Sequence, residues 1–278
     1  MLPADGHVHS EWSWEAGEGS MRLACARAVD LGLPAISFTE HGDLTTWTVG
    51  SGLVPRLPEC FRARLGADGL LRPPDLDVPG YLDAVRRCRE LFPGLVIRTG
   101  VELSEPHWHA DRVADLLAGG DFERVLGSVH SIRTPEGDVM VDELLTTRPA
   151  DETVRAYLAE VLRMVESCDA FQVLAHLDYP VRSWPASAGP YDARAHEVEV
   201  RAVLRALADS GRALEVNTTA PSDGEVVGWW REEGGTAVSF GSDAHAPAKV
   251  ARRFAETAEL VRGKGFEPGP SDFWVRVD

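Results

Sequence analysis

Residues 95–101, LVIRTGV, form a short apolar stretch rich in β-branched side chains, which is typical of a strand buried on both faces of a sheet. Comparable stretches recur along the chain, at residues 5–9, 35–39 (AISFT), 124–129 (RVLGSV), 171–175 (FQVLA), 213–216 (ALEV) and 236–240 (TAVSF). Longer helical patterns alternate with them, which predicts an α/β fold with a parallel sheet of seven βα units. The alternation fits a distorted TIM-like barrel, and it also fits an open doubly wound sheet.

The helical patterns carry their own start and stop signals. Residues 20–31 begin at a serine cap and end before Gly32. Residues 151–167 form a long amphipathic pattern, residues 194–210 end before Gly211, and residues 247–261 begin with Pro247 in the first turn. These boundaries predict helices between the later strands of the sheet.

The composition is that of a globular protein. Apolar residues make up 44% and charged residues 26% of the 278 residues, and 28 Lys+Arg face 44 Asp+Glu, a net charge of -16. This acidic balance argues against a partner such as long nucleic acid. The first residues, MLPADGHVHS, do not resemble a signal peptide, and no apolar run is long enough for a membrane span. The four cysteines form no CxxC pair or disulfide framework, so we expect a cytoplasmic protein. The sequence does not indicate an oligomeric state.

The rhythm of strands and helices predicts a single domain over residues 1–278. Residues 44–79 interrupt it with a Pro- and Gly-rich, irregular segment. Such a segment is either a functional lid or binding loop, or a tolerated surface insertion. Residues 263–278 are expected to form a C-terminal extension that packs on the barrel.

Histidines and carboxylates follow the predicted strands. The carboxyl ends of parallel strands meet at one end of an α/β fold, so we expect these side chains to converge there and form the functional site. They are His7 and His9, Glu40 and His41, Glu102, His130, His176 and Asp178, Asn217, and Asp243 and His245.

The spacing of these residues favours a metal site. His7 and His9, at positions i and i+2, point to the same side of a strand, and Asp243 and His245 repeat that spacing. Neutral imidazoles with carboxylates such as Glu102, and without thiolates, suit catalytic Zn, Fe or Mn. The candidate ligands exceed what one ion needs, so we expect two to three divalent ions.

Six motifs, taken together and in order, resemble the PHP family, the polymerase and histidinol phosphatase metal-dependent hydrolases. The motifs are DGHVH at 5–9, FTEH at 38–41, GVE at 100–102, GSVH at 127–130, AHLD at 175–178 and GSDAH at 241–245. The resemblance covers almost the whole chain. It implies a distorted seven-unit barrel with a trinuclear metal site at the carboxyl ends of the strands.

The resemblance also implies a ligand set for each ion. The first ion would be held by His7, His9, Glu102 and Asp243, the second by Glu102, His130 and His176, and the third by His41, His245 and one further residue. Many family members have histidine at this last position, whereas this chain has Glu15. Glu15 is either a ligand of the third ion, the interpretation we favour, or a solvated loop residue that leaves that site empty.

The expected activity is hydrolysis of a small phosphate monoester by a hydroxide that bridges two ions, with histidinol phosphate as the expected substrate. Asp243 and His245 are the catalytic candidates, with His245 or a metal-bound water protonating the leaving alkoxide. Arg182 is the first candidate for a phosphate clamp and Arg133 the second, and His107 is a candidate for lining the substrate pocket. The alternative interpretation of Arg182 and His107 is that each lies in a surface loop without a role in binding.

Other substrates and functions stay open at this stage. Relatives in the family act on nucleoside monophosphates, on bisphosphonucleosides or on short oligonucleotides. A non-catalytic metal-binding domain and an amidohydrolase-like enzyme are rivals from other classes, but the nearly complete ligand set and the motif pattern disfavour them. Trp12 and Trp14 are predicted to wall the pocket, Trp229 and Trp230 to pack a helix onto the barrel, and His196 to be solvated.

Overall fold

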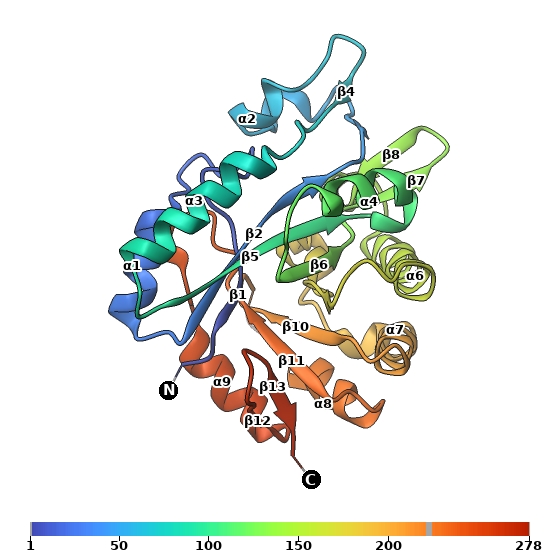
Figure 1. Cartoon of the computed structure of the whole chain (residues 1–278). Helices are drawn as coiled ribbons and strands as arrows, with labels where there is room; N and C mark the ends of the chain where they lie inside the picture. The colour runs from blue at the N-terminus through green and yellow to red at the C-terminus, as the bar shows by residue number, and fades with distance from the viewer. Residues whose placement is uncertain (1, 221–223, 278) are drawn as a thin grey trace.

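The computed structural model describes residues 2–220 and 224–277. The centre of the fold is one curled sheet of nine strands (Figure 1). Across the sheet, the strands are β1 (Asp5–Val8), β2 (Ala35–Asp43), β5 (Val96–Ser104), β6 (Arg124–Ser128), β9 (Val173–Leu174), β10 (Ala213–Asn217), β11 (Ala237–Gly241), β13 (Trp274–Arg276) and β12 (Phe266–Pro268). Neighbouring strands from β1 to β11 are parallel, which confirms the predicted α/β class.

The curl brings β11 back towards β1 along a seam. The peptide N–H of Asp243 donates to the His7 carbonyl at 2.8 Å, and the N–H of His9 donates to the Ala244 carbonyl at 3.0 Å. Asp5, at the start of β1, accepts hydrogen bonds from the N–H groups of Ser242 at 3.0 Å and Ala251 at 2.9 Å. The first strand and the segment after β11 are therefore held together by backbone and side-chain bonds.

Helices surround the outside of the sheet (Figure 1). They are α1 (Met21–Leu31), α2 (Glu59–Arg62), α3 (Val78–Leu91), α4 (Ala110–Ala118), α5 (Val141–Thr147), α6 (Ala150–Ser167), α7 (Glu197–Asp209), α8 (Gly224–Glu232) and α9 (Phe254–Gly263). Short 3-10 turns lie between them, at η1 (Val54–Arg56), η2 (Pro106–Trp108), η3 (Tyr179–Ser183), η4 (Ala186–Ala188), η5 (Ala193–His196) and η6 (Pro247–Lys249).

Several predicted boundaries are wrong, and both β2 and β5 are longer than predicted. Strand β2 continues four residues beyond the predicted end to Asp43, because it stays paired with β5 as far as Ser104, so Glu40 and His41 lie within the strand. The helix predicted from Pro247 begins only at Phe254. Ala251 and Arg253 have positive φ angles of 53° and 59°, and a right-handed helix cannot run through such backbone.

The core lies between the sheet and its helices. Trp230 of α8 is fully buried and its indole N–H donates to the Ala237 carbonyl at 3.1 Å, so this helix packs on the sheet. The buried Tyr81 hydroxyl donates to the Phe38 carbonyl and accepts from the Gly100 N–H, both at 2.7 Å, and so joins α3 to β2 and β5. Within the described residues, no helix has the length and apolar character needed to cross a membrane.

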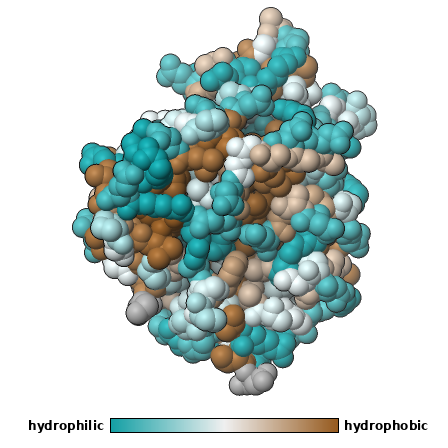
Figure 2. Space-filling view, in the orientation of Figure 1, coloured by the Kyte–Doolittle hydropathy of each residue, from teal (hydrophilic) through white to brown (hydrophobic). Residues whose placement is uncertain are grey.

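Residues 44–79 fold into a small projection beyond the strand ends (Figure 1). It contains β3 (Trp47–Thr48) paired with β4 (Leu70–Leu71), together with η1 and α2, and Trp47, Val49 and Leu71 form an apolar cluster of its own. A hairpin of β7 (Ser131–Thr134) and β8 (Gly137–Met140) lies beside it. In the space-filling view, hydrophilic residues cover much of the projection and apolar residues gather below it (Figure 2).

The residues after α9 extend the sheet. Strand β13 pairs antiparallel with β11, and β12 pairs with β13. The expected C-terminal extension therefore packs on the sheet as a hairpin at its edge. Phe266 and Trp274 of this hairpin are buried and join the main core.

Candidate metal centre

The ligand-type side chains of the sequence meet at the carboxyl edge of the parallel strands. His41 and Glu102 are register partners on β2 and β5, so they lie side by side on the sheet. His130, His176 and Asp243 each follow the end of their strand by two residues. The backbone of His176 and Asp243 has positive φ, 22° and 50°, a conformation that costs energy in non-glycine residues and clusters at functional sites.

The first group of ligands joins both ends of the seam. Nε2 of His7 and Nε2 of His9 are 3.0 Å apart, and Oδ1 of Asp243 lies 3.2 Å from Nε2 of His9. Oε2 of Glu102 is 3.4 Å from Nε2 of His7. His7, His9 and Asp243 lie close enough together to hold a metal ion, with Glu102 beside them.

A second group uses the other oxygen of Glu102. Oε1 of Glu102 is 2.6 Å from Nε2 of His176 and 3.5 Å from Nε2 of His130. The Nε2 atoms of these two histidines are 3.3 Å apart. Glu102 therefore presents one oxygen to each group, which is the geometry of a carboxylate that bridges two ions.

Glu15 lies in a third group. Its Oε1 is 2.9 Å from Nε2 of His41 and 3.2 Å from Nε2 of His245, and these two nitrogen atoms are 3.4 Å apart. The three side chains come from the turn after β1, from β2 and from the loop after β11. The structure thus brings Glu15 to the site instead of leaving it in a solvated loop.

Buried charges set the protonation of these groups. Burial raises the pKa of Glu102, but the charges of His7 and His176 outweigh it and hold that pKa well below its usual range. Burial lowers the pKa of His9, and the charges of His41 and His245 lower it further. Ionised carboxylates and a neutral imidazole are the forms that bind metal ions. The donor chemistry of the three groups therefore fits divalent cations.

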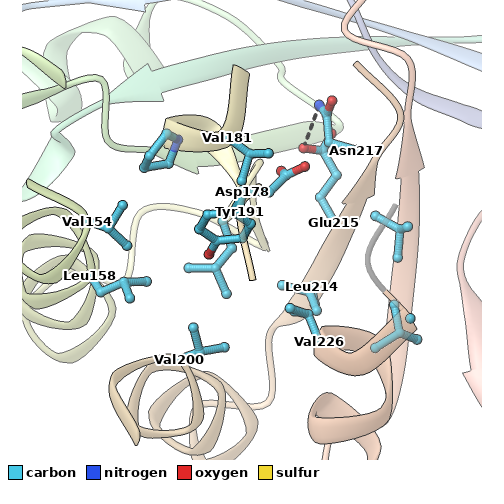
Figure 3. Close-up of a pocket in the computed structure, with 15 residues that line it drawn as sticks. Val154, Leu158, Asp178, Val181, Tyr191, Val200, Leu214, Glu215, Asn217 and Val226 are labelled. Carbon is cyan, nitrogen blue, oxygen red and sulfur yellow. Dashed lines mark hydrogen bonds between the residues drawn. The ribbon is translucent and has the colours of Figure 1, made fainter. Parts of the chain in front are cut away.

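Glu215 supports the ligands from behind, and nothing in the sequence analysis singled it out. Its carboxylate accepts a hydrogen bond from Nδ1 of His7 at 2.7 Å, from the N–H of His176 at 2.7 Å and from Nδ2 of Asn217 at 3.1 Å, the last drawn in Figure 3. The bond to Nδ1 leaves Nε2 of His7 free for a metal. The sequence signal that could have identified Glu215 is an acidic residue inside the apolar run ALEV, residues 213–216.

Behind Glu215 lies a mostly apolar cavity of about 410 Å³, between the sheet and α6, α7 and α8 (Figure 3). Val154, Leu158, Val200 and Leu214 form its walls, while Asp178 lies at its polar end with Glu215 and Asn217. Burial raises the pKa of Asp178 to about 6. Asp178 therefore lies behind the candidate ligands and not among them.

Glu40, although next to His41, also faces away from the ligands. Its carboxylate accepts from the N–H of Ser10 at 3.0 Å and from the hydroxyl of Ser13 at 2.6 Å. Oγ of Ser13 lies 3.0 Å from Nδ1 of His9. Glu40 thus fixes the turn after β1, and this turn orients His9.

A cavity of about 250 Å³ opens over the three groups. The projection formed by residues 44–79 contributes Trp47, Leu57, Pro58 and Phe61 to its wall. Trp14, a predicted wall residue, instead packs behind Phe61 with ring centroids 4.7 Å apart, and Trp12 packs against the main core. The irregular segment therefore covers part of the candidate site.

Arg182 lines the same cavity. Its Nη2 lies 2.7 Å from Oδ2 of Asp243, and its guanidinium is 5.2 Å from the centre of the Tyr179 ring. Its buried Nε has no hydrogen-bond partner within the described residues. Arg182 thus has a donor to spare beside the ligand groups.

Arg133 and His107 lie elsewhere, in a separate surface pocket. Nε2 of His107 is 2.6 Å from Oε1 of Glu160 on α6, and Arg133 stacks on Trp108 at 4.3 Å. For His107 the cause is η2, which turns the chain after β5 outward towards α6, whereas Arg133 lies on β7, which also packs near α6. The structure therefore does not place these two residues at the candidate metal centre.

His196 was predicted to be solvated, and this prediction is wrong. The side chain is buried, stacks on Tyr191 with ring centroids 6.1 Å apart, and lies 3.5 Å from a carboxylate oxygen of Asp151. It precedes α7, where η5 holds it against the body of the protein.

Known proteins resemble this chain along most of its length. Histidinol-phosphatase of Lactococcus lactis subsp. lactis is 25% identical over 289 residues, which cover 100% of this chain and 97% of the relative. A probable histidinol-phosphatase of Thermotoga maritima is 33% identical over 175 residues, covering 60% of this chain and 65% of the relative.

The fold is also that of a solved relative. The crystal structure of histidinol phosphate phosphatase from Lactococcus lactis subsp. lactis, in complex with zinc, L-histidinol and phosphate, superposes with a TM-score of 0.77 at 22% identity and covers 95% of this chain and 94% of its own. The sequence model of the PHP domain matches residues 5–219. This match spans well over half of the chain, from β1 past β10, and the chain therefore belongs to the PHP domain family.

Proposed function

We propose that this protein is a metal-dependent phosphatase that hydrolyses histidinol phosphate to histidinol and phosphate. The observation that carries the proposal is the convergence of three ligand groups on one cavity of about 250 Å³. Full-length relatives named histidinol-phosphatase support the choice of substrate. The small cavity also favours a small phosphate ester over a polymer.

The proposed architecture is one domain over residues 1–278, a distorted seven-unit barrel with its metal site at the carboxyl ends of the strands. In it, residues 44–79 are an insertion that covers the site, and residues 263–278 are an extension on the sheet. The contributions of Trp47 and Phe61 to the cavity wall support the role of the insertion.

Each ligand group would hold one divalent ion such as Zn, Fe or Mn. We assign His7, His9, Glu102 and Asp243 to the first, Glu102, His130 and His176 to the second, and Glu15, His41 and His245 to the third. Glutamate in place of histidine adds a negative charge to the third group, which strengthens its attraction for a cation. Two ions are the minimum that this donor set would serve.

When bound, such ions supply a nucleophilic hydroxide at neutral pH and neutralise charge on the phosphoryl oxygens. The residues of the chain orient the substrate. Arg182, with a guanidinium that can donate to two oxygens, would hold the phosphoryl group beside Asp243. Glu215 would keep His7 in the correct tautomer and orientation. His245, the most exposed of the candidate histidines, has one free ring nitrogen, so it would serve either as a ligand of the third ion or as the holder of the proton that the leaving alkoxide needs.

The test is a substrate screen before and after removal of metal. The protein loaded with Zn, Mn or Fe should hydrolyse L-histidinol phosphate in preference to AMP, a bisphosphonucleoside and a short single-stranded oligonucleotide. Chelation should abolish turnover, and the same ions should restore it. Full turnover of a rigorously metal-free preparation would refute the mechanism, and preference for a nucleotide would refute the substrate.

A further inference from the structure

Five carboxylates line the cavity over the candidate metal centre, and one of them lacks a cationic partner. Four face a histidine or arginine within 3.6 Å: Glu15, Asp43, Glu102 and Asp243. The fifth, Asp142, has no ion pair with any Lys, Arg or His of the described residues. Among the described residues, its carboxylate accepts from backbone N–H groups, its own and that of Glu143, the latter at 3.2 Å from Oδ1.

Asp142 is also held in place by the fold. It lies in the first turn of α5, directly after β8, and the neighbouring Met140 lines the cavity beside it. Burial raises the pKa of its carboxyl group, and His130 and Glu15 are close enough to act on it electrostatically. A half-buried carboxylate without a cationic partner costs free energy, and a cation that binds beside it in the cavity would offset that cost.

Beside the histidines and Arg182 that also line the cavity, another part of its wall is apolar. Trp47, Leu57 and Phe61 from the insertion, with Tyr179 from η3, present rings and methyl groups to the cavity. Within the described residues, no hydrogen bond or ion pair joins Asp142 to a candidate metal ligand. Its surroundings therefore suit the charged nitrogen of an organic ligand, with the apolar part of that ligand against the rings.

We propose that Asp142 binds the ammonium group of the substrate and so selects phosphate monoesters that carry an amino group next to the phosphorylated carbon. This inference rests on the proposed function. In histidinol phosphate, the amino group lies one carbon from the ester CH2. With the phosphoryl group held between Arg182 and the ligand groups, the amine would face Asp142 and the imidazole ring would face the aromatic wall.

A matched pair of substrates tests the proposal. L-Histidinol phosphate carries the ammonium group, whereas 3-(imidazol-4-yl)propyl phosphate has the same ring, carbon chain and phosphate but no ammonium group. Asp142→Asn in the metal-loaded enzyme should lower kcat/KM for L-histidinol phosphate by about 10- to 100-fold, mainly through KM, which is the effect of one lost charge-assisted bond. The value for 3-(imidazol-4-yl)propyl phosphate should stay within about twofold.

The control is Asp138→Asn. Asp138 lies on β8, directly before α5, but it pairs with Arg133 at 3.7 Å, outside the cavity. This variant should leave both substrates unaffected. Metal content should be the same in the parent and in both variants, which separates substrate recognition from metal loss.

Two results would overturn the proposal. If kcat of Asp142→Asn falls equally for both substrates, Asp142 is a proton donor to the alkoxide and not a residue that selects the substrate. If the ratio of the two kcat/KM values is the same in Asp142→Asn as in the parent, Asp142 has no part in substrate selection. L-Histidinol binding by calorimetry gives a measure without turnover: it should weaken at least tenfold in Asp142→Asn, and equal binding would also refute the proposal. A parent enzyme that hydrolyses neither substrate but binds L-histidinol through Asp142 would instead refute the proposed function.

Discussion

Replacing Glu215 by glutamine should weaken metal binding without touching a proposed ligand. The carboxylate accepts from Nδ1 of His7 through one oxygen, and from the N–H of His176 and Nδ2 of Asn217 through the other. Glutamine keeps only one acceptor. Its amide NH2 must face either the His7 ring N–H or the His176 peptide N–H, so one hydrogen bond becomes a contact between two donors.

The expected size follows from that single lost bond. A hydrogen bond to a charged group contributes about 1.5–3 kcal/mol, and loss of a carboxylate that orients a metal-bound histidine typically lowers metal affinity or activity about 10- to 100-fold. The two estimates agree, since about 1.4 kcal/mol corresponds to a factor of ten. We therefore expect Glu215→Gln to bind its ions about 10- to 100-fold more weakly than the parent.

Competition with a chelator of known affinity measures the effect. Glu160→Gln is the matched control, because Glu160 is also buried and bonded to a histidine, His107 at 2.6 Å, but outside the site. This control should lose stability in urea without any change in metal affinity. If Glu215→Gln retains parental affinity, or loses no more than Glu160→Gln, the assigned role of Glu215 is wrong.

Three further outcomes are expected. Glu15→Ala should lose up to one metal equivalent and much of its turnover while remaining folded, and Glu15→His should recover the metal; unchanged metal content would remove Glu15 from the site. Gly241→Ala should resemble Glu215→Gln in chelator titrations, because the added Cβ would lie 1.9 Å from Oε1 of Glu215; parental affinity would contradict this. Trp230→Ala should cost about 3–5 kcal/mol in urea unfolding, and a loss below about 1 kcal/mol would contradict its place in the core.

The seven parallel strands could be predicted because each is an apolar run between helices, whereas the short strands β3, β4, β7, β8, β12 and β13 were not predicted. The ends of the parallel strands could not be predicted, since pairing with a neighbour decides them: β2 continues to Asp43 only because β5 continues beside it. The start of α9 could not be predicted for a different reason. Alanine and arginine seldom adopt positive φ, so nothing in the sequence indicated that Ala251 and Arg253 would break the helix.

Convergence at the carboxyl edge could be predicted from the order of strands and helices, and the structure brings most of the predicted histidines and carboxylates together there. Glu40 and Asp178, which were in the predicted set, lie behind the ligand groups instead. Residues beyond the first turn after a strand were less predictable. Arg182 stays at the cavity, whereas η2 carries His107 away from it. Glu215 was missed because its partners, His7 and His176, are distant in sequence and are revealed only by the curl of the sheet.

The seam between β1 and the segment after β11 also orders events during protein synthesis. Asp5 and Ser242, which it joins, are 237 residues apart, and Asp243 reaches His7 and His9 only once the seam has formed. His7 and His9 are synthesised early, and Asp243 joins them only after nearly all of the described chain has been synthesised. Contacts of such high sequence separation form slowly. We therefore expect metal loading to be a late, post-translational step, in which the nascent chain holds an incomplete set of ligands until the barrel closes.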